Sequence, residues 1–246
     1  MPLLYADWAP WWPLLSPPEV AADEARLIDG LLQHSPARRI RSLLELGCGG
    51  GTTAVHLARR YTLTLLDRSA PMLALAAARV PQARTVEADL RDFALPAPVD
   101  AVLLHDAASY LPDRASVRAA VAAARRALAP GGRLLCLPDH TAETFRPGAS
   151  SGGTDAPDGR GARFLEWSWK AKPDDDHYTV AFALLLRHPD GRVEHRHETH
   201  TLSAFPRAVW AAALREAGFR AAEVPLRRQD GSAGGVAFVG DVKGRG

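Results

Sequence analysis

Leu43-Leu-Glu-Leu-Gly-Cys-Gly-Gly-Gly-Thr52 is the stretch that decides the fold of this 246-residue chain. A short apolar run at residues 42–46 leads straight into the glycines, and an amphipathic stretch at residues 52–60 follows them. This order predicts a strand, a tight loop and a helix. Glycines in such a loop let a ligand approach the backbone and the exposed amides at the start of the helix. We therefore expect a nucleotide or nucleoside ligand here, with a plain flexible turn as the alternative.

The alternation of short apolar runs and amphipathic stretches continues on both sides of the glycine loop. Residues 18–34 have helical spacing, with acidic side chains near their start, where the helix dipole favours them. We expect further strands at residues 62–66, 83–87, 101–104 and 133–137, and helices at residues 71–80 and 114–129. Strands that are apolar on both faces and separated by helices indicate an α/β fold with a parallel sheet covered on both sides.

The pattern changes after residue 140. Residues 147–162 are rich in Gly, Ser, Asp and Pro, which predicts a long mobile loop. Three segments with strand alternation and turn-like connections follow, at residues 164–170, 178–186 and 193–202. They predict an inserted three-stranded antiparallel sheet. A helix at residues 207–217 and two last strands, at residues 219–226 and 235–242, come after it.

These elements divide the chain into four expected parts. They are an N-terminal lid and helix at residues 1–35, a cofactor-binding core at 36–140, the loop and inserted sheet at 141–203, and a C-terminal helix and hairpin at 204–246. The C-terminal hairpin is expected to complete the core sheet. With 47% hydrophobic residues, a chain of this length can build one soluble domain with a small appendage.

Composition and charge argue against several classes of protein. The formal net charge is only +2 and the arginines are scattered, so a nucleic-acid partner is not expected. No apolar run approaches the roughly 20 residues needed to cross a bilayer, and no basic segment precedes an apolar core at the start. We expect neither a membrane span nor a secretory signal. Cys48 and Cys136 have no zinc-site spacing, and two cysteines are too few for a disulfide framework, which favours the cytoplasm.

Two cofactors are compatible with the glycine loop. As Gly49-x-Gly51-x-x-Ala54, the loop matches the dinucleotide fingerprint, and Asp67 at the end of the next strand would bind a ribose. A phosphate-binding P-loop is excluded, because no Lys-Ser/Thr pair follows the glycines.

As Glu45-x-Gly47-x-Gly49-x-Gly51, the same loop resembles motif I of the class I S-adenosylmethionine-dependent methyltransferases. This resemblance also accounts for Asp89 after the third strand, for the Pro-Gly-Gly turn within residues 128–133 and for the closing pair of strands. The dinucleotide fingerprint explains none of these three features. The resemblance implies a Rossmann-like seven-stranded sheet with an antiparallel C-terminal hairpin, and S-adenosylmethionine as the cofactor.

The resemblance also implies a set of cofactor contacts. Asp67 would accept hydrogen bonds from both ribose hydroxyls, and Asp89 would accept one from the adenine amino group, with the Leu90 amide facing the ring. The full implied set is Tyr5, Trp12, Glu45, Gly47, Cys48, Gly49, Gly51, Asp67, Arg68, Met72, Asp89, Leu90, His105 and Asp106.

The segment His105-Asp-Ala-Ala-Ser-Tyr110 follows the fourth strand, at the edge of the sheet where ligands of α/β proteins bind. His105 is a candidate general base, Asp106 a candidate ligand for an amine, and Tyr110 a candidate wall of the acceptor pocket. The alternative is structural: His105 caps its strand and Tyr110 packs under the next helix. No Asn/Asp-Pro-Pro-aromatic tetrapeptide occurs here, and Cys136 has no Pro-Cys context, which argues against DNA amino methylation and RNA carbon methylation.

The N-terminal stretch Tyr5-Ala-Asp-Trp-Ala-Pro-Trp-Trp12 is unusually aromatic for a chain with 7% aromatic residues. It resembles the Tyr-Asp-x-x-Ala-x-x-Tyr opening that caps the cofactor in many small-molecule methyltransferases, with Trp12 in place of the second tyrosine. Such a lid would exclude water from the sulfonium. The alternative is that these rings anchor the first helix to the core.

The inserted sheet contains His195-Arg-His-Glu-Thr-His200. Strand alternation puts His195 and His197 on one face and Arg196, Glu198 and His200 on the other. A metal site needs three converging ligands, so no metal is predicted here. By resemblance to glycine and amino-sugar N-methyltransferases, one face of this sheet would roof the acceptor pocket, which makes Arg196 and His200 candidate acceptor contacts beside Tyr110.

We therefore expect an enzyme that transfers a methyl group to an amine or hydroxyl of a small molecule by in-line displacement. A sulfonium methyl already has a good leaving group, so the protein mainly positions the reactants, which is worth about 7 to 11 kcal/mol. The alternatives are a protein or RNA methyltransferase, which would present an open basic surface, and a non-catalytic binding protein. The sequence is compatible with a homodimer.

Overall fold

The structure is a computed structural model that describes residues 1–227 and 233–244. Its larger part is a seven-stranded sheet with the strand order β10-β11-β5-β4-β1-β2-β3. The strands are β1 (Ser42–Leu46), β2 (Thr62–Asp67), β3 (Arg84–Glu87), β4 (Val99–Leu104), β5 (Leu128–Cys136), β10 (Arg220–Arg227) and β11 (Ala233–Asp241). Neighbouring strands from β3 to β5 are parallel, and β11 is antiparallel to both β5 and β10. The expected Rossmann-like sheet with an antiparallel C-terminal hairpin is confirmed.

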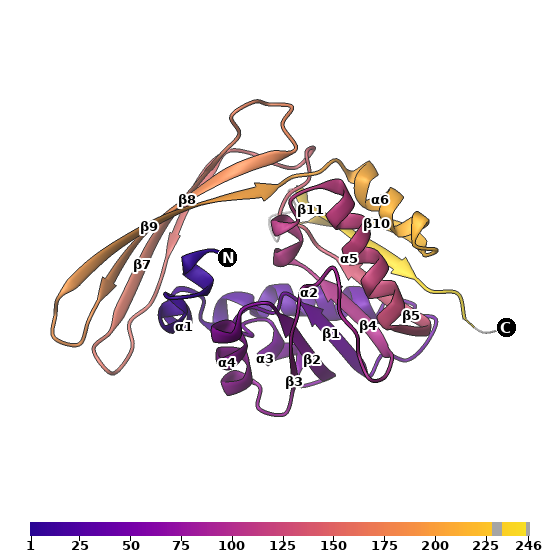
Figure 1. Cartoon of the computed structure of the whole chain (residues 1–246), viewed down its shortest axis with the longest axis horizontal. Coiled ribbons are helices and arrows are strands. Elements are labelled where there is room, and N and C mark those ends of the chain that lie inside the picture. The colour runs from indigo at the N-terminus through magenta and orange to yellow at the C-terminus, as the bar shows by residue number, and fades with distance from the viewer. Residues whose placement is uncertain (228–232, 245–246) are drawn as a thin grey trace.

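Helices cover both faces of this sheet (Figure 1). Side chains of α5 (Arg114–Ala127) and α6 (Arg207–Glu216) pack on one face, in a cluster that includes Val117 and Trp210. Side chains of α2 (Ala22–Gln33), α3 (Ala54–Leu57) and α4 (Ala70–Arg79) pack on the other. Every residue of β4 is buried, which explains why residues 101–104 of this strand are apolar without alternation. Nowhere in the described ranges is there a helix long and apolar enough to cross a bilayer.

Two helices are shorter than expected. The helix predicted at 52–60 contains only the four α-helical residues of α3, followed by turns. The helix predicted at 18–34 begins with a 3-10 turn, η3 (Pro18–Ala21), and becomes α-helical at Ala22. Pro17 and Pro18 explain the second difference, because proline lacks the N–H that an α-helical interior requires.

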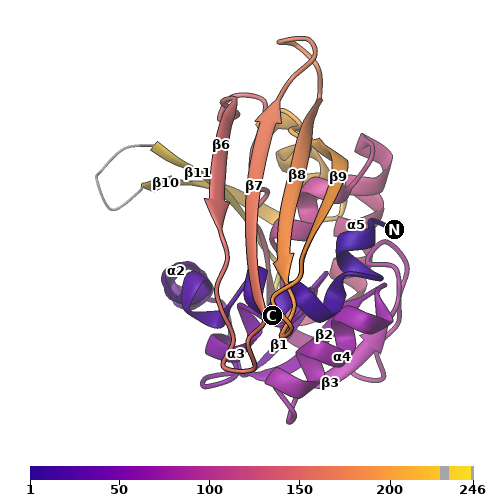
Figure 2. The ribbon, with the colours of Figure 1, turned by 90° about the vertical axis from the view of Figure 1, so that its left-hand side faces the viewer.

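A second, four-stranded antiparallel sheet stands beside the first (Figures 1 and 2). Its strands are β6 (Gly148–Gly152), β7 (Gly161–Trp169), β8 (His177–Arg187) and β9 (Val193–Ser203), in that order. The prediction of three strands was wrong, since β6 lies within the stretch expected to be a mobile loop. Strand β6 is an edge strand of Gly, Ala and Ser, and such residues carry no hydrophobic pattern. At Gly152 a Cβ atom would lie 2.8 Å from the Phe164 ring, so a larger residue there would displace that ring.

The N-terminal segment lies between the two sheets (Figure 1). It consists of η1 (Leu3–Tyr5), η2 (Ala9–Trp11) and α1 (Trp12–Leu15). Its buried side chains pack against the inward face of the inserted sheet in one apolar cluster, whose buried members are Leu4, Trp8, Leu14, Ala162, Leu184 and Leu186. The backbone of this segment is also held, because Thr154 donates to the Leu14 carbonyl from both its amide and its hydroxyl. The segment therefore connects the insert to the core.

A buried arginine joins the last strand to the first long helix. Arg133 on β5 donates from Nε and Nη2 to both oxygens of Asp241 at the end of β11. Its Nη1 donates to the carbonyl oxygens of Leu31, Leu32 and His34, at the C-terminal end of α2. A cation there satisfies carbonyls that have no partner within the helix and complements the helix dipole.

Candidate active site

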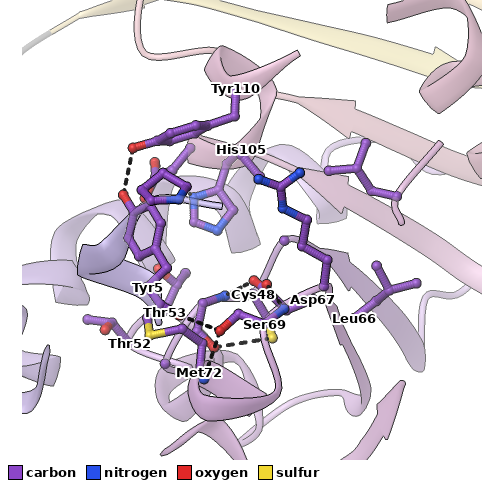
Figure 3. A pocket seen from close by; sticks show the side chains of 18 of the residues that line it. Tyr5, Cys48, Thr52, Thr53, Leu66, Asp67, Ser69, Met72, His105 and Tyr110 are labelled. Atoms are coloured by element: carbon purple, nitrogen blue, oxygen red, sulfur yellow. Dashed lines mark hydrogen bonds and ion pairs between the residues drawn. The ribbon is translucent and has the colours of Figure 1, made fainter. Parts of the chain in front are cut away.

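A cavity of about 500 Å³ opens at the carboxyl edge of β1, β2 and β4, beneath the N-terminal segment (Figure 3). Ligands of open α/β sheets bind at this edge. Most of the cofactor contacts expected from the sequence line this cavity: Tyr5, Trp12, Gly47, Cys48, Gly49, Asp67, Arg68, Met72, Asp89, Leu90, His105 and Asp106. Glu45 and Gly51 lie just behind the lining, where Glu45 is buried against His105 and Gly51 faces Ala76. The lining also includes Glu24 and Ser69, which sequence analysis did not single out.

Asp67 shapes the glycine loop from the end of β2. Its Oδ2 accepts the amide hydrogen of Gly49 at 2.8 Å, and its Oδ1 accepts that of Ser69 at 2.9 Å (Figure 3). A carboxylate has about four acceptor sites, so two remain for hydroxyl groups of a ligand. This arrangement fits a ribose.

Glycine is required in the loop for two reasons. Gly47 has φ +70°, a conformation that L side chains rarely adopt, and a Cβ atom there would lie 2.2 Å from the Cβ atom of Ala107. At Gly50 the obstacle is Trp12, whose ring carbon would lie 2.5 Å from a Cβ atom. The loop therefore lies directly under the N-terminal segment.

At the far wall of the cavity, Asp89 is paired with Arg91. Oδ1 of Asp89 accepts from the backbone amide and Nε of Arg91, and Oδ2 accepts from Nη2 at 2.6 Å. The pair is partly exposed, and the hydrogen bonds of Arg91 hold the pKa of Asp89 below its usual range. Asp89 is thus an ionised acceptor beside Leu90, as an adenine amino group would require.

His105 lies between two carboxylates at the opposite end. Its Nε2 is 2.9 Å from Oε1 of Glu45, and its Nδ1 is 3.2 Å from Oδ1 of Asp106. Burial opposes the charged ring, but Asp106 and Glu45 outweigh it and raise the pKa of His105 well above its ordinary value. The two carboxylates therefore favour the protonated ring, and a protonated imidazole has no lone pair free to take a proton.

Glu24, His105 and Asp106 also offer ligand atoms that lie within 4.8 Å of one another. A protonated histidine does not bind a metal, because both ring nitrogens carry hydrogen. Oε2 of Glu45 is buried and has no hydrogen-bond partner among the described residues. This oxygen of Glu45 lies near the carboxylates of Glu24 and Asp106. Three carboxylates around one point fit the α-ammonium group of S-adenosylmethionine. The absence of a metal stays a prediction.

Tyr110 connects the cavity to the inserted sheet. It comes from η4 (Asp106–Tyr110), and its hydroxyl lies 2.7 Å from that of Tyr5 and 2.8 Å from Nδ1 of His200 on β9 (Figure 3 shows the tyrosine pair). On β9, Arg196, Glu198 and His200 do share the inward face, as the alternation predicts. Neither Arg196 nor His200 belongs to the cavity lining of the described residues, and Arg196 lies over the Trp8 ring and pairs with Glu194.

Asp139 is a residue near the site that sequence analysis missed. It follows β5 by three positions, and its amide donates to the Ser109 hydroxyl at 3.2 Å. Asp139 is exposed, and it lies beside Ser109 of η4 without being part of the cavity lining among the described residues. The rule that ligands bind at the carboxyl ends of strands would have pointed to this position.

The fold and the cavity define a class I S-adenosylmethionine-dependent methyltransferase: a glycine loop after β1, an acid after β2, and an antiparallel last strand in a seven-stranded sheet. Comparison with known proteins agrees. The model of a family described as "Methyltransferase domain" matches residues 43–132.

Two curated relatives extend the likeness to nearly the whole chain. The dTDP-3-amino-3,4,6-trideoxy-α-D-glucopyranose N,N-dimethyltransferase of Streptomyces venezuelae is 30% identical over 90% of this chain and 91% of its own length. The dTDP-3-amino-3,6-dideoxy-α-D-glucopyranose N,N-dimethyltransferase of Streptomyces fradiae is 31% identical over 83% of this chain and 78% of its own length.

Solved structures agree as well. Streptomyces venezuelae DesVI superposes with a TM-score of 0.78 at 29% identity, over 90% of this chain and 91% of that one. A SAM-bound amino pentose methyltransferase from Micromonospora echinaspora gives a TM-score of 0.72 at 28% identity, over 89% and 90% of the two chains. The chain belongs to this family of small-molecule methyltransferases, and its cofactor is S-adenosylmethionine.

Proposed function

We propose that the protein methylates the amine of an amino sugar. The observation that carries this proposal is the pair of hydroxyls of Tyr5 and Tyr110, which lie 2.7 Å apart and line the cavity. Hydroxyl oxygens accept hydrogen bonds from an amine. The relatives in the two curated comparisons are named for 3-amino sugars linked to dTDP, which supports the same acceptor class.

Different residues of the cavity bind different parts of the cofactor. S-adenosylmethionine, when bound, supplies a methyl group on a sulfonium, a neutral thioether being the leaving group. We infer that Asp67 binds the ribose, that Asp89 and Leu90 bind the adenine, and that Glu45 with Asp106 receives the methionine ammonium. Positioning by these groups accounts for most of the expected rate.

We assign His105 a positioning role instead of the role of base. As an imidazolium between Glu45 and Asp106, it orients both carboxylates and reduces their mutual repulsion. An amine that arrives neutral needs no base for its attack. Tyr110 and His200 stay proposed acceptor-side residues, whereas Arg196 is proposed to hold the N-terminal segment through Trp8.

The function is tested with S-adenosylmethionine and dTDP-3-amino-3,6-dideoxy-α-D-glucopyranose as the acceptor probe. Mass spectrometry should show the addition of one and then two methyl groups. The matched control is the same nucleotide sugar with a hydroxyl in place of the 3-amino group, which should gain none. Methylation of the hydroxyl sugar alone would contradict the amine assignment, and cofactor binding without methylation of any sugar amine would favour a non-catalytic binding protein.

A protein or RNA substrate is less well supported. Such a substrate would need an open basic surface, but the inward face of the inserted sheet is covered by the N-terminal segment and carries Glu166, Glu194 and Glu198. Incubation with total RNA and with cell protein should therefore give no labelled polymer.

The homodimer and the cytoplasmic location also stay proposals. On the outward face of the insert, Leu165, Trp167, Leu185 and Val193 are exposed, which supports a contact with a second copy. Sedimentation of the wild type and of Trp167→Lys tests this: a shift from dimer to monomer is expected. Cys48 and Cys136 are both free and buried, which is consistent with a reducing compartment.

A further inference from the structure

Four side chains form a continuous polar chain from the cavity to the inserted sheet. The Tyr5 hydroxyl, which lines the cavity, is 2.7 Å from the Tyr110 hydroxyl, and that hydroxyl is 2.8 Å from Nδ1 of His200. Nε2 of His200 is 3.1 Å from Oε2 of Glu198. Glu198 also accepts the amide hydrogens of Leu3 at 2.6 Å and Leu4 at 3.0 Å.

Glu198 determines which group donates and which accepts in this series of polar side chains. Burial would favour the neutral acid, but His200 and the two backbone amides hold the pKa of Glu198 below its usual range. Nε2 of His200 makes no other polar contact among the described residues and faces a carboxylate, which only accepts. We therefore assign the hydrogen of a neutral His200 to Nε2, which makes its Nδ1 an acceptor. The Tyr110 hydroxyl must then donate to His200, and the Tyr5 hydroxyl must donate to Tyr110. The lone pairs of Tyr5 are left facing the cavity.

We propose that this chain removes the proton that the acceptor amine loses between two methyl transfers, with His200 as the final proton acceptor and Glu198 as the residue that positions it. The inference rests on the proposed amine methylation. A primary amine that has received one methyl group is an ammonium, and it cannot attack again until it gives up a hydrogen.

The protons balance along the chain. The N–H bond of the ammonium breaks, its electron pair stays on nitrogen, and the proton joins the Tyr5 oxygen. The former Tyr5 proton moves to Tyr110, and the former Tyr110 proton moves to Nδ1 of His200. The imidazolium faces the Glu198 carboxylate, which stabilises it until the product leaves. The Nδ1 proton then returns through Tyr110 and Tyr5 to water in the emptied cavity, which restores the Nε2–H tautomer and both hydroxyl directions. Both tyrosines end protonated, as they began.

The surroundings of His200 suit a buried proton acceptor. Its side chain is only 2% exposed, and the rings of Phe182, Tyr5 and Tyr110 lie within 5.9 Å of it. The ionisable groups that face it are Glu198 on its own strand, Glu166 on β7, Tyr110 on η4 and Tyr5 on η1, with Asp139 acting on both tyrosines. Burial raises the pKa of Tyr5 and of Tyr110, so both hydroxyls keep their hydrogens at neutral pH.

The direction of the chain can be measured without turnover. In protein labelled with 15N-histidine, NMR at pH 8 should show His200 as the Nε2–H tautomer, assigned by the loss of its signals in His200→Gln. Glu198→Gln should shift the tautomer balance toward Nδ1–H. A wild-type His200 that is mainly Nδ1–H, or that stays an imidazolium at pH 8, would overturn the proposal.

The proton path is tested with His200→Gln, since a glutamine can still accept from Tyr110 and donate to Glu198 but cannot take a proton. With the dTDP-3-amino sugar probe, the rate of the second methylation relative to that of the first should fall about 100-fold in His200→Gln, because acid–base help is worth at least that much. Monomethyl sugar should then be released.

Tyr110→Phe and Tyr5→Phe should also slow the second methylation relative to the first. These two variants keep the proposal testable if His200→Gln does not fold. The matched control is His188→Gln, because His188 pairs with Glu194 at 3.1 Å on the same sheet but packs against Trp11 instead of a tyrosine. Equal rates for both steps in wild type and His200→Gln would overturn the relay, as would a wild type that stops at one methyl group. A wild type that methylates no amine would instead refute the proposed function.

Discussion

At the scale of single residues, His105 shows how two acids can keep a buried histidine charged. Its side chain is 5% exposed, so burial alone would favour the neutral ring. Glu45 on one side and Asp106 on the other reverse that preference. Because the folded protein then binds a proton that the unfolded chain releases near pH 6.5, the stability of the fold depends on pH.

The contribution of His105 to the free energy of unfolding should be fully present below about pH 6.5. It should be lost as the pH rises through the higher pKa that His105 has in the folded state. Urea unfolding of the cofactor-free protein from pH 5.5 to 9 measures it. We expect His105→Gln to be clearly less stable than wild type at the acid end, with the difference shrinking toward pH 9. The exposed His34→Gln is the control. A difference that stays constant with pH would show that His105 is not charged.

Asp67 should determine cofactor affinity. Asp67→Asn removes a charged acceptor, which should weaken the binding of S-adenosylhomocysteine by about 1.5 to 3 kcal/mol. Calorimetry measures the loss, and circular dichroism checks that the loop still folds. Asp92→Asn is the control, because the Asp92 side chain is 96% exposed. Unchanged affinity in Asp67→Asn would mean that Asp67 does not hold the ribose.

Residues with a local motif were predictable, and those without one were not. Gly47, Asp67 and His105 follow strands at recognisable spacings, so the sequence places them at the cavity. Asp139 and Glu198 have no such signature, since a lone acid is usually a solvated surface residue. Their positions depend on the packing of β5 and β9 against other elements, which periodicity does not describe.

At the scale of elements, the N-terminal segment is both a cover and a connector. Tyr5 and Trp12 line the cavity, whereas Leu4 and Trp8 are buried against the inserted sheet. From the sequence we expected its tryptophans either to cap the cofactor or to anchor the first helix. Their packing against the inserted sheet was not expected. Strand β6 was missed for a related reason, because Gly and Ser pair through their backbone and leave no apolar pattern.

Deleting residues 1–14 should therefore affect both the cofactor and the insert. The seven-stranded sheet loses no strand and should stay folded, while cofactor affinity and methyl transfer should fall sharply as water enters the site. Hydrogen exchange should rise in β7 and β8, whose apolar inward face is uncovered. Unchanged exchange there, with a melting temperature lowered for the core sheet, would show that the segment supports the core instead.

At the scale of the whole molecule, the sheet topology was predictable because strand and helix patterns alternate strictly over residues 36–140. The way in which the inserted sheet leans over the core was not. That arrangement follows from contacts between segments far apart in sequence, such as the Arg114–Asp176 ion pair between α5 and the β7–β8 connection.

The assembled cavity should distinguish between nucleotide cofactors. A ligand that binds only the folded state raises its stability in proportion to the logarithm of ligand concentration. We expect S-adenosylhomocysteine to raise the melting temperature with a concentration dependence that reflects micromolar affinity, and NAD to leave it unchanged. Stabilisation by NAD alone would contradict the assignment of the cofactor.

The place of β11 in the sheet has a consequence for biosynthesis. This strand, the last along the described part of the chain, lies between β10 and β5. During synthesis, β5 therefore remains an open, apolar edge strand until residue 241 has left the ribosomal exit tunnel. Over the same period Arg133 lacks its ion-pair partner Asp241. An open edge pairs readily with other chains. Nascent chains stalled before residue 233 should accordingly need a chaperone to stay out of aggregates, whereas chains in which β11 has emerged from the ribosome can close the sheet.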